Sequence, residues 1–196
     1  MDRGTGSCLG RETPRRLHGH HRGPGNGIAP ALDDADGSLC VIVWRIATDT
    51  PDYTADDMSG VGAKVSGGRW NRPGNAMLYC GANIALVALE TFVHLKAGGL
   101  PLNRYLVQID VPDDVWNKAH DMRHPPVGWD AIPAAAVSLD AGDSWVKAQS
   151  STLMIVPSVI VPEEYNVLIN PLHSDASKLR AKKVRKWLYD SRLAKP

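Results

Sequence analysis

The sequence predicts a single domain of the α+β class. Its 196 residues suit one domain with a sizeable core. Several apolar runs of strand length follow one another without helices between them, which argues against a doubly wound parallel sheet. No internal repeat is visible. Repeated short strands without helices between them are typical of an α+β fold.

The composition indicates no bulk electrostatic partner. A formal net charge of +1 gives no general attraction to nucleic acid or to a membrane surface. The cysteines Cys8, Cys40 and Cys80 are widely spaced, which fits a reducing compartment better than a disulfide framework. No apolar run reaches the ~18 to 20 residues of a membrane span. We therefore expect a cytoplasmic protein with no membrane association.

Residues 1–38 are predicted to be a disordered or extension segment, and residues 39–196 to form the folded domain. The first thirty residues are rich in glycine and arginine and have little apolar surface to bury, so they cannot offset the entropy of ordering. His18, His20 and His21 form a histidine cluster without a second set of ligands. No metal role is assigned to them.

The first strand is expected over residues 39–46, as a buried apolar run interrupted late by Arg45. A charge at that position needs a partner, and either an acidic loop or a ligand anion satisfies the need. The connection over residues 48–68 is rich in Asp, Pro, Thr, Ser and Gly. Its length is typical of a binding loop or a lid.

A tight corner follows at Gly67-Gly68-Arg69-Trp70-Asn71-Arg72-Pro73-Gly74-Asn75, before a short strand over residues 76–80. Glycine on one side and Pro-Gly on the other restrict where Arg69 points. A fork-shaped guanidinium on a glycine hinge is suited to binding phosphate. The corner therefore suggests an enzyme that acts on a phosphorylated small molecule.

A helix is expected over residues 83–96, with Asn83 as its N-cap and Gly98-Gly99 as its stop signal. Glu90 shares one stripe of this helix with Leu86 and His94. The other apolar positions are expected to form its packing faces: Leu89, Phe92, Val93 and Leu95. A lone carboxylate in so apolar a run is costly unless it has a function.

The rest of the chain predicts further strands over residues 105–111, 153–162 and 166–171, the second of them broken by Pro157. Gly142-Asp143-Ser144-Trp145 is expected to open a short helical or turn segment. His120 and His124 lie four apart, but Pro125-Pro126 directly behind them argues against a helical zinc pair. Residues 177–193 are expected to form a basic helix that packs through its apolar side.

Taken in order, seven motifs resemble those of the RES domain family, which is named for its arginine, glutamate and serine. They are Arg45-Ile46, the Gly-Gly-Arg-Trp-Asn-x-Pro-Gly loop with Tyr79 and Glu90 after it, Gly142-Asp143-x-Trp145, Ser151, Val156-Pro157-Ser158, Asn166 to Asn170-Pro171-x-His173, and Tyr189-Asp190-x-Arg192-Leu193. The resemblance covers roughly residues 41–193. A single such motif is weak evidence for the family, whereas seven motifs in the same order are specific to it.

The resemblance implies a bacterial toxin of a type II toxin–antitoxin pair. Its fold would have a mixed, largely antiparallel sheet core similar to that of the ADP-ribosyltransferase toxins, and its activity would consume NAD⁺. The implied partner is an Xre-like helix-turn-helix antitoxin, so that DNA binding would belong to the partner and no direct DNA binding is expected of this chain. A homo-oligomer within the toxin–antitoxin complex is compatible with this picture.

Residue by residue, the resemblance places Arg45 and Arg69 on the NAD⁺ phosphates, Tyr79 on the nicotinamide side, and Glu90 at the ribose next to the scissile bond. For the serine it favours Ser151, with Ser158 second. No metal and no cofactor are implied. Because no G-x-G-x-x-G fingerprint is present, NAD⁺ is expected to be the substrate and not a hydride carrier.

The residue types suit this chemistry, because a carboxylate stabilises the oxocarbenium-like state formed when the nicotinamide–ribose bond breaks. The sequence leaves the acceptor open. Water or phosphate would make the protein an NAD⁺-degrading enzyme, the first expectation, and a protein acceptor would make it a mono-ADP-ribosyltransferase. A third class, a non-catalytic binding module, would place Glu90 in solvent far from Arg69.

Overall fold

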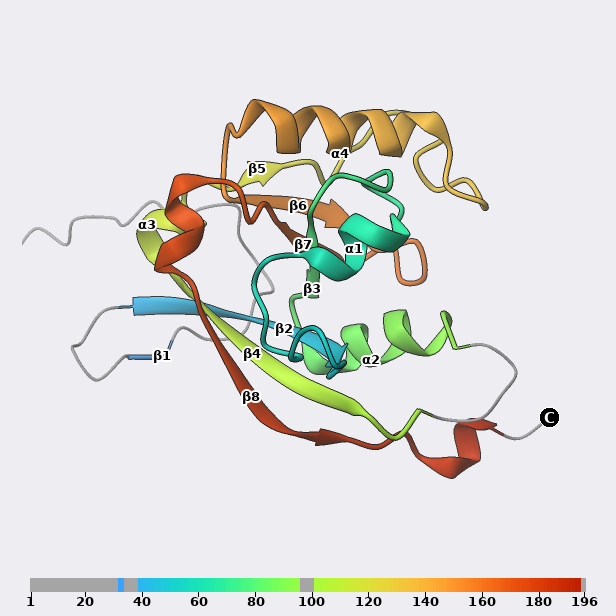
Figure 1. Ribbon diagram of the computed structural model, residues 1–196. Helices are drawn as coiled ribbons and strands as arrows, with labels where there is room; N and C mark the ends of the chain where they lie inside the picture. The colour runs from blue at the N-terminus through green and yellow to red at the C-terminus, as the bar shows by residue number, and fades with distance from the viewer. Residues whose placement is uncertain (1–31, 34–38, 96–100, 195–196) are drawn as a thin grey trace, which may run out of the picture.

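The computed structural model describes residues 32–33, 39–95 and 101–194, which form an α+β fold (Figure 1). The elements follow one another in this order: β1 (Leu32–Asp33), β2 (Leu39–Thr48), α1 (Val61–Ser66), β3 (Leu78–Gly81), α2 (Ile84–Phe92), β4 (Arg104–Pro112), α3 (Asp113–Trp116), β5 (His120–Asp121), α4 (Ala136–Ala148), β6 (Leu153–Pro157), β7 (Tyr165–Ile169), the 3₁₀ turn η1 (Ser174–Lys178), β8 (Arg180–Trp187) and the 3₁₀ turn η2 (Ser191–Ala194). β1 falls within the segment 1–38, whose other residues lie outside the described part, as do His18, His20 and His21.

The strands of the described residues form one sheet, with the order β5–β6–β7–β3–β2–β4–β8 and β1 paired to β2. β5 and β6 run parallel, and every other pair is antiparallel. The expected mixed, largely antiparallel sheet is therefore confirmed. β2 and β4 share the longest ladder, from Cys40 opposite Pro112 to Thr48 opposite Arg104. By contrast, β2 meets β3 at a single register position, Trp44 opposite Gly81.

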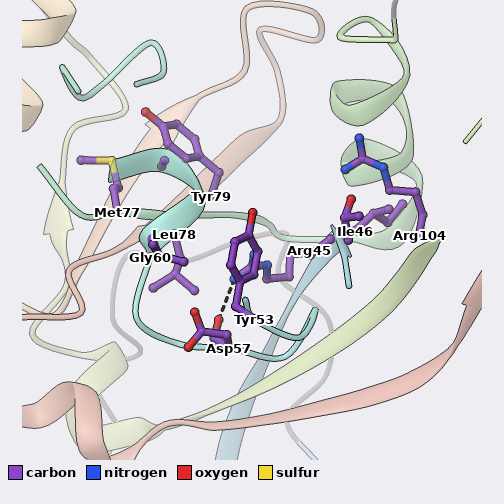
Figure 2. A pocket seen from close by; sticks show the side chains of 14 residues that line it. Arg45, Ile46, Tyr53, Asp57, Gly60, Met77, Leu78, Tyr79 and Arg104 are labelled. Carbon is purple, nitrogen blue, oxygen red and sulfur yellow. Dashed lines mark hydrogen bonds between the residues drawn. The ribbon is translucent and has the colours of Figure 1, made fainter. Parts of the chain in front are cut away.

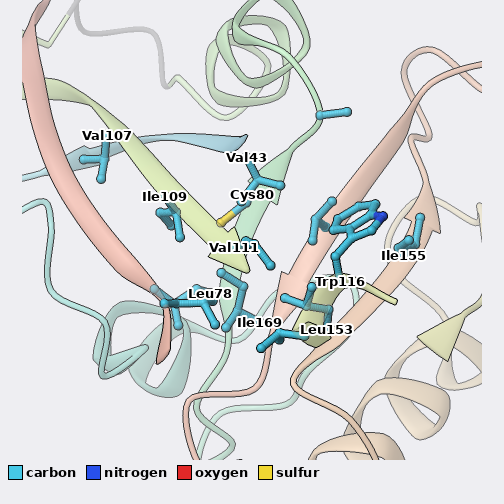
Figure 3. Packing of buried hydrophobic residues seen from close by; sticks show 14 of the residues in the cluster. Val43, Leu78, Cys80, Val107, Ile109, Val111, Trp116, Leu153, Ile155 and Ile169 are labelled. Carbon is cyan, nitrogen blue, oxygen red and sulfur yellow. The ribbon is translucent and has the colours of Figure 1, made fainter. Parts of the chain in front are cut away.

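Buried apolar residues lie on both faces of the sheet. Successive strand residues point to opposite faces, so Leu153 and Ile155 join the main cluster with residues of β2, β3 and β4 (Figure 3). Met154 and Val156 point the other way and pack with Trp145 of α4. Because β6 is buried on both faces, its sequence is a continuous apolar run and shows no alternation.

Helix α2 begins where the sequence predicts and ends earlier. The Asn83 side chain accepts a hydrogen bond from the Leu86 amide at 2.8 Å, so the expected N-cap is present. The helix ends at Phe92, and Gly98-Gly99 lies outside the described residues. The expectation that Leu89 and Val93 pack is wrong, since they are 37% and 52% exposed. Only one narrow stripe of this short helix meets the sheet.

The end of the chain corrects the expectation of a basic helix over residues 177–193. β8 pairs antiparallel with β4, from Arg180 opposite Asp110 to Trp187 opposite Arg104. Without β8, that edge of β4 would leave a row of backbone N–H and C=O groups unpaired. This pairing outweighs the high intrinsic helix propensity of Lys, Arg and Ala. The lysine-rich composition is also typical of a strand at a sheet edge.

Helix α4 is longer than the sequence indicates, because it begins at Ala136, before the Gly142-Asp143 motif. It lies along the β5–β6–β7 half of the sheet (Figure 1). Gly142 faces the chain segment at Trp70 so closely that a Cβ atom there would lie 1.8 Å from the Trp70 carbonyl oxygen. In the described residues, no helix is both long and apolar enough to cross a membrane.

We expect Gly142→Ala to destabilise the fold. Alanine in a helix interior normally stabilises by about 1 kcal/mol over glycine. Here the added methyl group meets a backbone carbonyl that cannot rotate away, and such overpacking costs roughly 1 to 3 kcal/mol or more. Because an approach of 1.8 Å lies at the upper end of that cost, urea unfolding should show a net loss of about 2 kcal/mol or more.

The matched control for this prediction is Ser144→Ala, an exposed position in the same helix. It should leave the free energy of unfolding unchanged or slightly raised. Equal stability of the Gly142→Ala variant and the wild type would contradict the tight approach of α4 to Trp70.

Candidate active site

One cavity of about 1010 Å³ gathers four of the residues that the sequence singles out. Arg45 comes from β2, Tyr79 from β3 and Glu90 from α2, while Arg69 lies in the loop between α1 and β3. Glu90 is partly exposed and lines the same cavity as Arg69. The arrangement differs from that expected of a non-catalytic module, in which Glu90 would lie in solvent far from Arg69.

The loop that carries Arg69 needs both of its glycines. Gly67 has a φ of 69°, in the left-handed region that favours glycine. A Cβ atom at Gly68 would lie 2.5 Å from the Tyr79 hydroxyl oxygen. The Gly68 amide donates a hydrogen bond to the Asn71 carbonyl at 2.9 Å, which closes the loop. Glycine at these two positions thus allows the loop to fold tightly over the Tyr79 ring.

Tyr79 also holds this loop through its hydroxyl group. The hydroxyl donates to Asn71 Oδ1 at 2.8 Å and accepts from the Trp70 amide at 2.9 Å. Asn71 is fully buried, and its amide group donates to the carbonyls of Ala63 and Asn75. Burial raises the pKa of Tyr79 well above its ordinary value, so the hydroxyl stays protonated and remains a donor.

Arg69 is oriented by carbonyl groups. Its Nη1 donates to the Trp129 oxygen at 2.9 Å and to the Ala131 oxygen at 2.8 Å. The Trp129 ring stacks on Trp70 with centroids 6.0 Å apart, which fixes the segment that supplies these carbonyls. No carboxylate pairs with Arg69 within the part of the chain that the structure describes. The positive charge of Arg69 is therefore not neutralised there.

Glu90 is held by two neutral donors. Its Oε1 accepts from the Ser158 hydroxyl at 2.8 Å and from the Asn166 side-chain amide at 2.7 Å. The Ser158 oxygen in turn accepts from the amides of Ile160 and Val161, both at 3.1 Å. These amides occupy the acceptor sites of the hydroxyl, so its proton is directed to Glu90. Among the described residues, Oε2 of Glu90 has no hydrogen-bond partner.

Of the two candidate serines, the structure places Ser158 next to Glu90 and Ser151 elsewhere. Ser151 is buried beside α4, where it accepts from Trp145 Nε1 at 2.9 Å and donates to the Leu153 carbonyl at 2.8 Å. Neither serine is among the residues that line the cavity, and Ser158 is connected to it through its hydrogen bond to Glu90. The contacts of Ser151 join α4 to the start of β6.

Arg45 donates to the Asp57 carbonyl at 3.2 Å and forms no ion pair in the described residues. The sequence leaves two partners open for Arg45, an acidic loop or a ligand anion. The acidic loop supplies a backbone oxygen and no carboxylate. The side chain lines the cavity, where a ligand anion can reach it.

Two residues of the site receive no role from the sequence, although Asn166 belongs to one of the family motifs. Asn166 is the polar member of the apolar strand β7, and that interruption was an available signal. Arg104 opens β4 and lines the cavity beside Arg45. No sequence pattern sets Arg104 apart, because it precedes the apolar run that marks the strand.

Asp143 of α4 anchors the Arg69 loop from outside the cavity. Its carboxylate accepts from the Arg72 amide at 3.1 Å, from Arg72 Nη1 at 2.7 Å and from the Asn75 side chain at 2.6 Å. Burial by itself would raise the pKa of Asp143, but the hydrogen bonds from Arg72 and Asn75 outweigh it, so the pKa is lowered below 3.8.

No group of three or more His, Cys, Asp or Glu side chains gathers as a metal site requires anywhere in residues 32–33, 39–95 and 101–194. His120 lies exposed on β5, and His124 lies exposed in the following turn.

With this fold and this cavity, the chain belongs to the RES domain family, which matches it over residues 42–191. It is 58% identical over 153 residues to the Prs ADP-ribosylating toxin of Sphingobium sp. strain YBL2, covering 76% of this chain and 94% of that one. It is 33% identical over 156 residues to Toxin Res of Photorhabdus laumondii, covering 79% and 98%. It is also 37% identical over 123 residues to Toxin Res of Yersinia enterocolitica, covering 62% and 79%. The predicted family is confirmed.

The lowered pKa of Asp143 predicts an acid dependence of stability. A carboxylate whose folded pKa is depressed contributes stability above its unfolded value, near 3.8, and that contribution is lost as the pH falls through the folded pKa. Asp143→Asn should therefore lower the unfolding temperature at pH 7 and flatten its decline below pH ~4.

Asp140→Asn is the matched control for this pH prediction. Asp140 also pairs with Arg72, at 2.7 Å, but its side chain is 66% exposed. Replacing it should therefore change the unfolding temperature and its pH dependence little. Parallel acid unfolding curves for the wild type and the Asp143→Asn variant would contradict the role of Asp143.

Proposed function

We propose that this RES protein is a toxin that consumes NAD⁺ by cleaving its nicotinamide–ribose bond. The observation that carries the proposal is the Glu90 carboxylate, which is fixed by Ser158 and Asn166 in a cavity that it shares with Arg45 and Arg69. A carboxylate held in one orientation beside unneutralised guanidinium groups suits a substrate that develops positive charge at a sugar and carries negative charge on phosphates.

In this proposal Glu90 stabilises the oxocarbenium-like state by its charge, and its unpartnered Oε2 accepts a ribose hydroxyl. Arg69 and Arg45 hold phosphate oxygens, which positions the ribose without taking part in bond cleavage. Tyr79 offers its ring to the nicotinamide side, while its hydroxyl stays bound to the loop. Nicotinamide leaves as a neutral group, so no general acid is required.

For the acceptor, we propose a protein, because the relative that is 58% identical is named an ADP-ribosylating toxin. This is the mono-ADP-ribosyltransferase alternative. Hydrolysis or phosphorolysis, the first expectation from the sequence, remains the second candidate. It is favoured by the partial exposure of Glu90, which lets water or phosphate approach the ribose carbon.

The cellular setting is part of the same proposal. The relatives carry toxin names, and the resemblance implies an Xre-like antitoxin as partner. Action in the cytoplasm follows from the composition, and a homo-oligomer within the toxin–antitoxin complex is compatible with the proposal. No direct DNA binding by this chain is proposed. NAD⁺ acts as substrate, and no metal or cofactor is required by the proposed chemistry.

The acceptor can be identified with NAD⁺ labelled in its adenine. The purified protein is incubated with it in buffer, in buffer with phosphate, and in a cell extract, and the products are separated by mass. Labelled macromolecule in the extract supports the transferase. Free ADP-ribose or its phosphate in buffer, at a rate equal to that in extract, would instead show degradation. Intact NAD⁺ in all three would contradict the proposed function.

Glu90→Gln should lower the rate of nicotinamide release by about 10²- to 10³-fold, because the charge that stabilises the transition state is lost. The amide oxygen can still accept from Ser158 and Asn166, so the variant should stay folded and bind NAD⁺. Nicotinamide release and thermal unfolding are the two measurements. A rate within threefold of the wild type would rule out the proposed role of Glu90.

The two serines should differ in what their loss changes. Ser158→Ala removes the hydroxyl that orients Glu90 and should lower the release rate roughly tenfold, with the larger effect on kcat. Ser151→Ala leaves Trp145 Nε1 without its acceptor and should cost about 1 to 3 kcal/mol of stability, with little effect on the rate. The opposite pattern would favour Ser151 as the site serine.

A further inference from the structure

A smaller cavity of about 220 Å³ adjoins the one that contains Glu90 (Figure 2). The two cavities share five lining residues, which form the wall between them: Arg45, Ile46, Ala63, Tyr79 and Arg104. Tyr53 and Asp57 also line the smaller cavity. The site therefore extends past the loop that carries Arg69.

Arg45 and Arg104 reach this wall from the neighbouring strands β2 and β4, near the end of β2. In the described residues, β2 is not paired with β3 beyond Trp44. Arg45 and Arg104 lie on opposite faces of the sheet, because Arg45 is opposite Val107 and Arg104 is opposite Thr48, the last residue of β2. Both residues line the two cavities.

Arg104 has no partner for its charge among the described residues. Its Nε is buried without a hydrogen-bond acceptor, and no described residue gives the guanidinium a carboxylate. The other arginines of the described residues do find oxygen partners: Arg72, Arg123 and Arg192 pair with aspartates, and Arg45, Arg69, Arg180 and Arg185 donate to backbone carbonyls. A partly buried cation without an acceptor is costly unless a ligand supplies one.

The charges that line the two cavities indicate where an anion can lie. The larger cavity has three arginines, Arg45, Arg69 and Arg104, and one carboxylate, Glu90. The smaller cavity has Arg45 and Arg104 but also Asp57. An anion is therefore favoured on the wall that Arg45 and Arg104 form between the cavities. It is disfavoured beside Glu90 and Asp57, which each line one of the cavities.

We propose that Arg104 is a substrate-binding residue that, with Arg45, binds the pyrophosphate of the dinucleotide on the wall between the two cavities. This inference rests on the proposed function and extends it to a residue outside the family motifs. Arg104 supplies a planar fork of N–H donors, which matches phosphate oxygens, and its terminal Nη groups have no acceptor among the described residues.

The test is binding of ADP-ribose, which carries the pyrophosphate but no scissile nicotinamide bond, measured by calorimetry. Arg104→Gln should weaken its Kd by about tenfold or more, since charge-assisted hydrogen bonds to phosphate are lost. Arg104→Lys keeps the charge without the fork and should recover part of the loss. Binding of nicotinamide, which has no phosphate, should be unchanged in both variants.

Arg185→Gln is the matched control, because Arg185 lies on the neighbouring strand β8 and lines neither cavity. It should bind ADP-ribose as the wild type does. If the wild type binds ADP-ribose and cleaves NAD⁺ while Arg104→Gln binds within twofold of it, the role of Arg104 is overturned and the proposed function stands. If the wild type neither binds ADP-ribose nor cleaves NAD⁺, the proposed function fails together with this inference.

Discussion

The contact between α4 and the Arg69 loop is the constraint on which this half of the site depends. Gly142 brings the helix against the Trp70 carbonyl, and the adjacent Asp143 binds the backbone and side chain of Arg72 and the side chain of Asn75. A larger side chain at position 142 would move the loop away, whereas loss of the carboxylate would release its far end. The loop in turn covers Tyr79, so the position of Arg69 depends on two neighbouring residues of one helix.

The carboxylate half of the site is supported separately. Glu90 is held by Ser158 after β6 and by Asn166 on β7, and neither of these residues contacts the Arg69 loop through a hydrogen bond in the described residues. In the described residues the two halves are also joined through the sheet, because β3, which carries Tyr79, pairs with β7, which carries Asn166. A structural change in α4 should nevertheless alter substrate positioning before it alters the orientation of Glu90, because β6 and β7 are buried in the core and hold that orientation themselves.

The sequence predicted those features that depend on local chemistry, and missed those that depend on neighbours in space. The Asn83 cap, the glycine hinge of Arg69 and the buried strand β6 follow from backbone rules that act within a few residues. β8 was taken for a helix because only the open edge of β4 makes a strand there the better solution. The choice between Ser151 and Ser158 likewise depends on where β6 ends relative to α2, which no spacing in the chain reveals.

The groups that orient the charges of this cavity do so without neutralising them. Arg69 is bound by two backbone carbonyls, Arg45 by one, and Glu90 by a hydroxyl and an amide. Had Glu90 been paired with an arginine, that ion pair would have cancelled the field that stabilises an oxocarbenium-like state. Neutral dipoles restrict the rotamers of these side chains and cancel less of their charge than an ion pair would. The charge thus remains available to a substrate that is anionic at its phosphates and becomes cationic at its ribose.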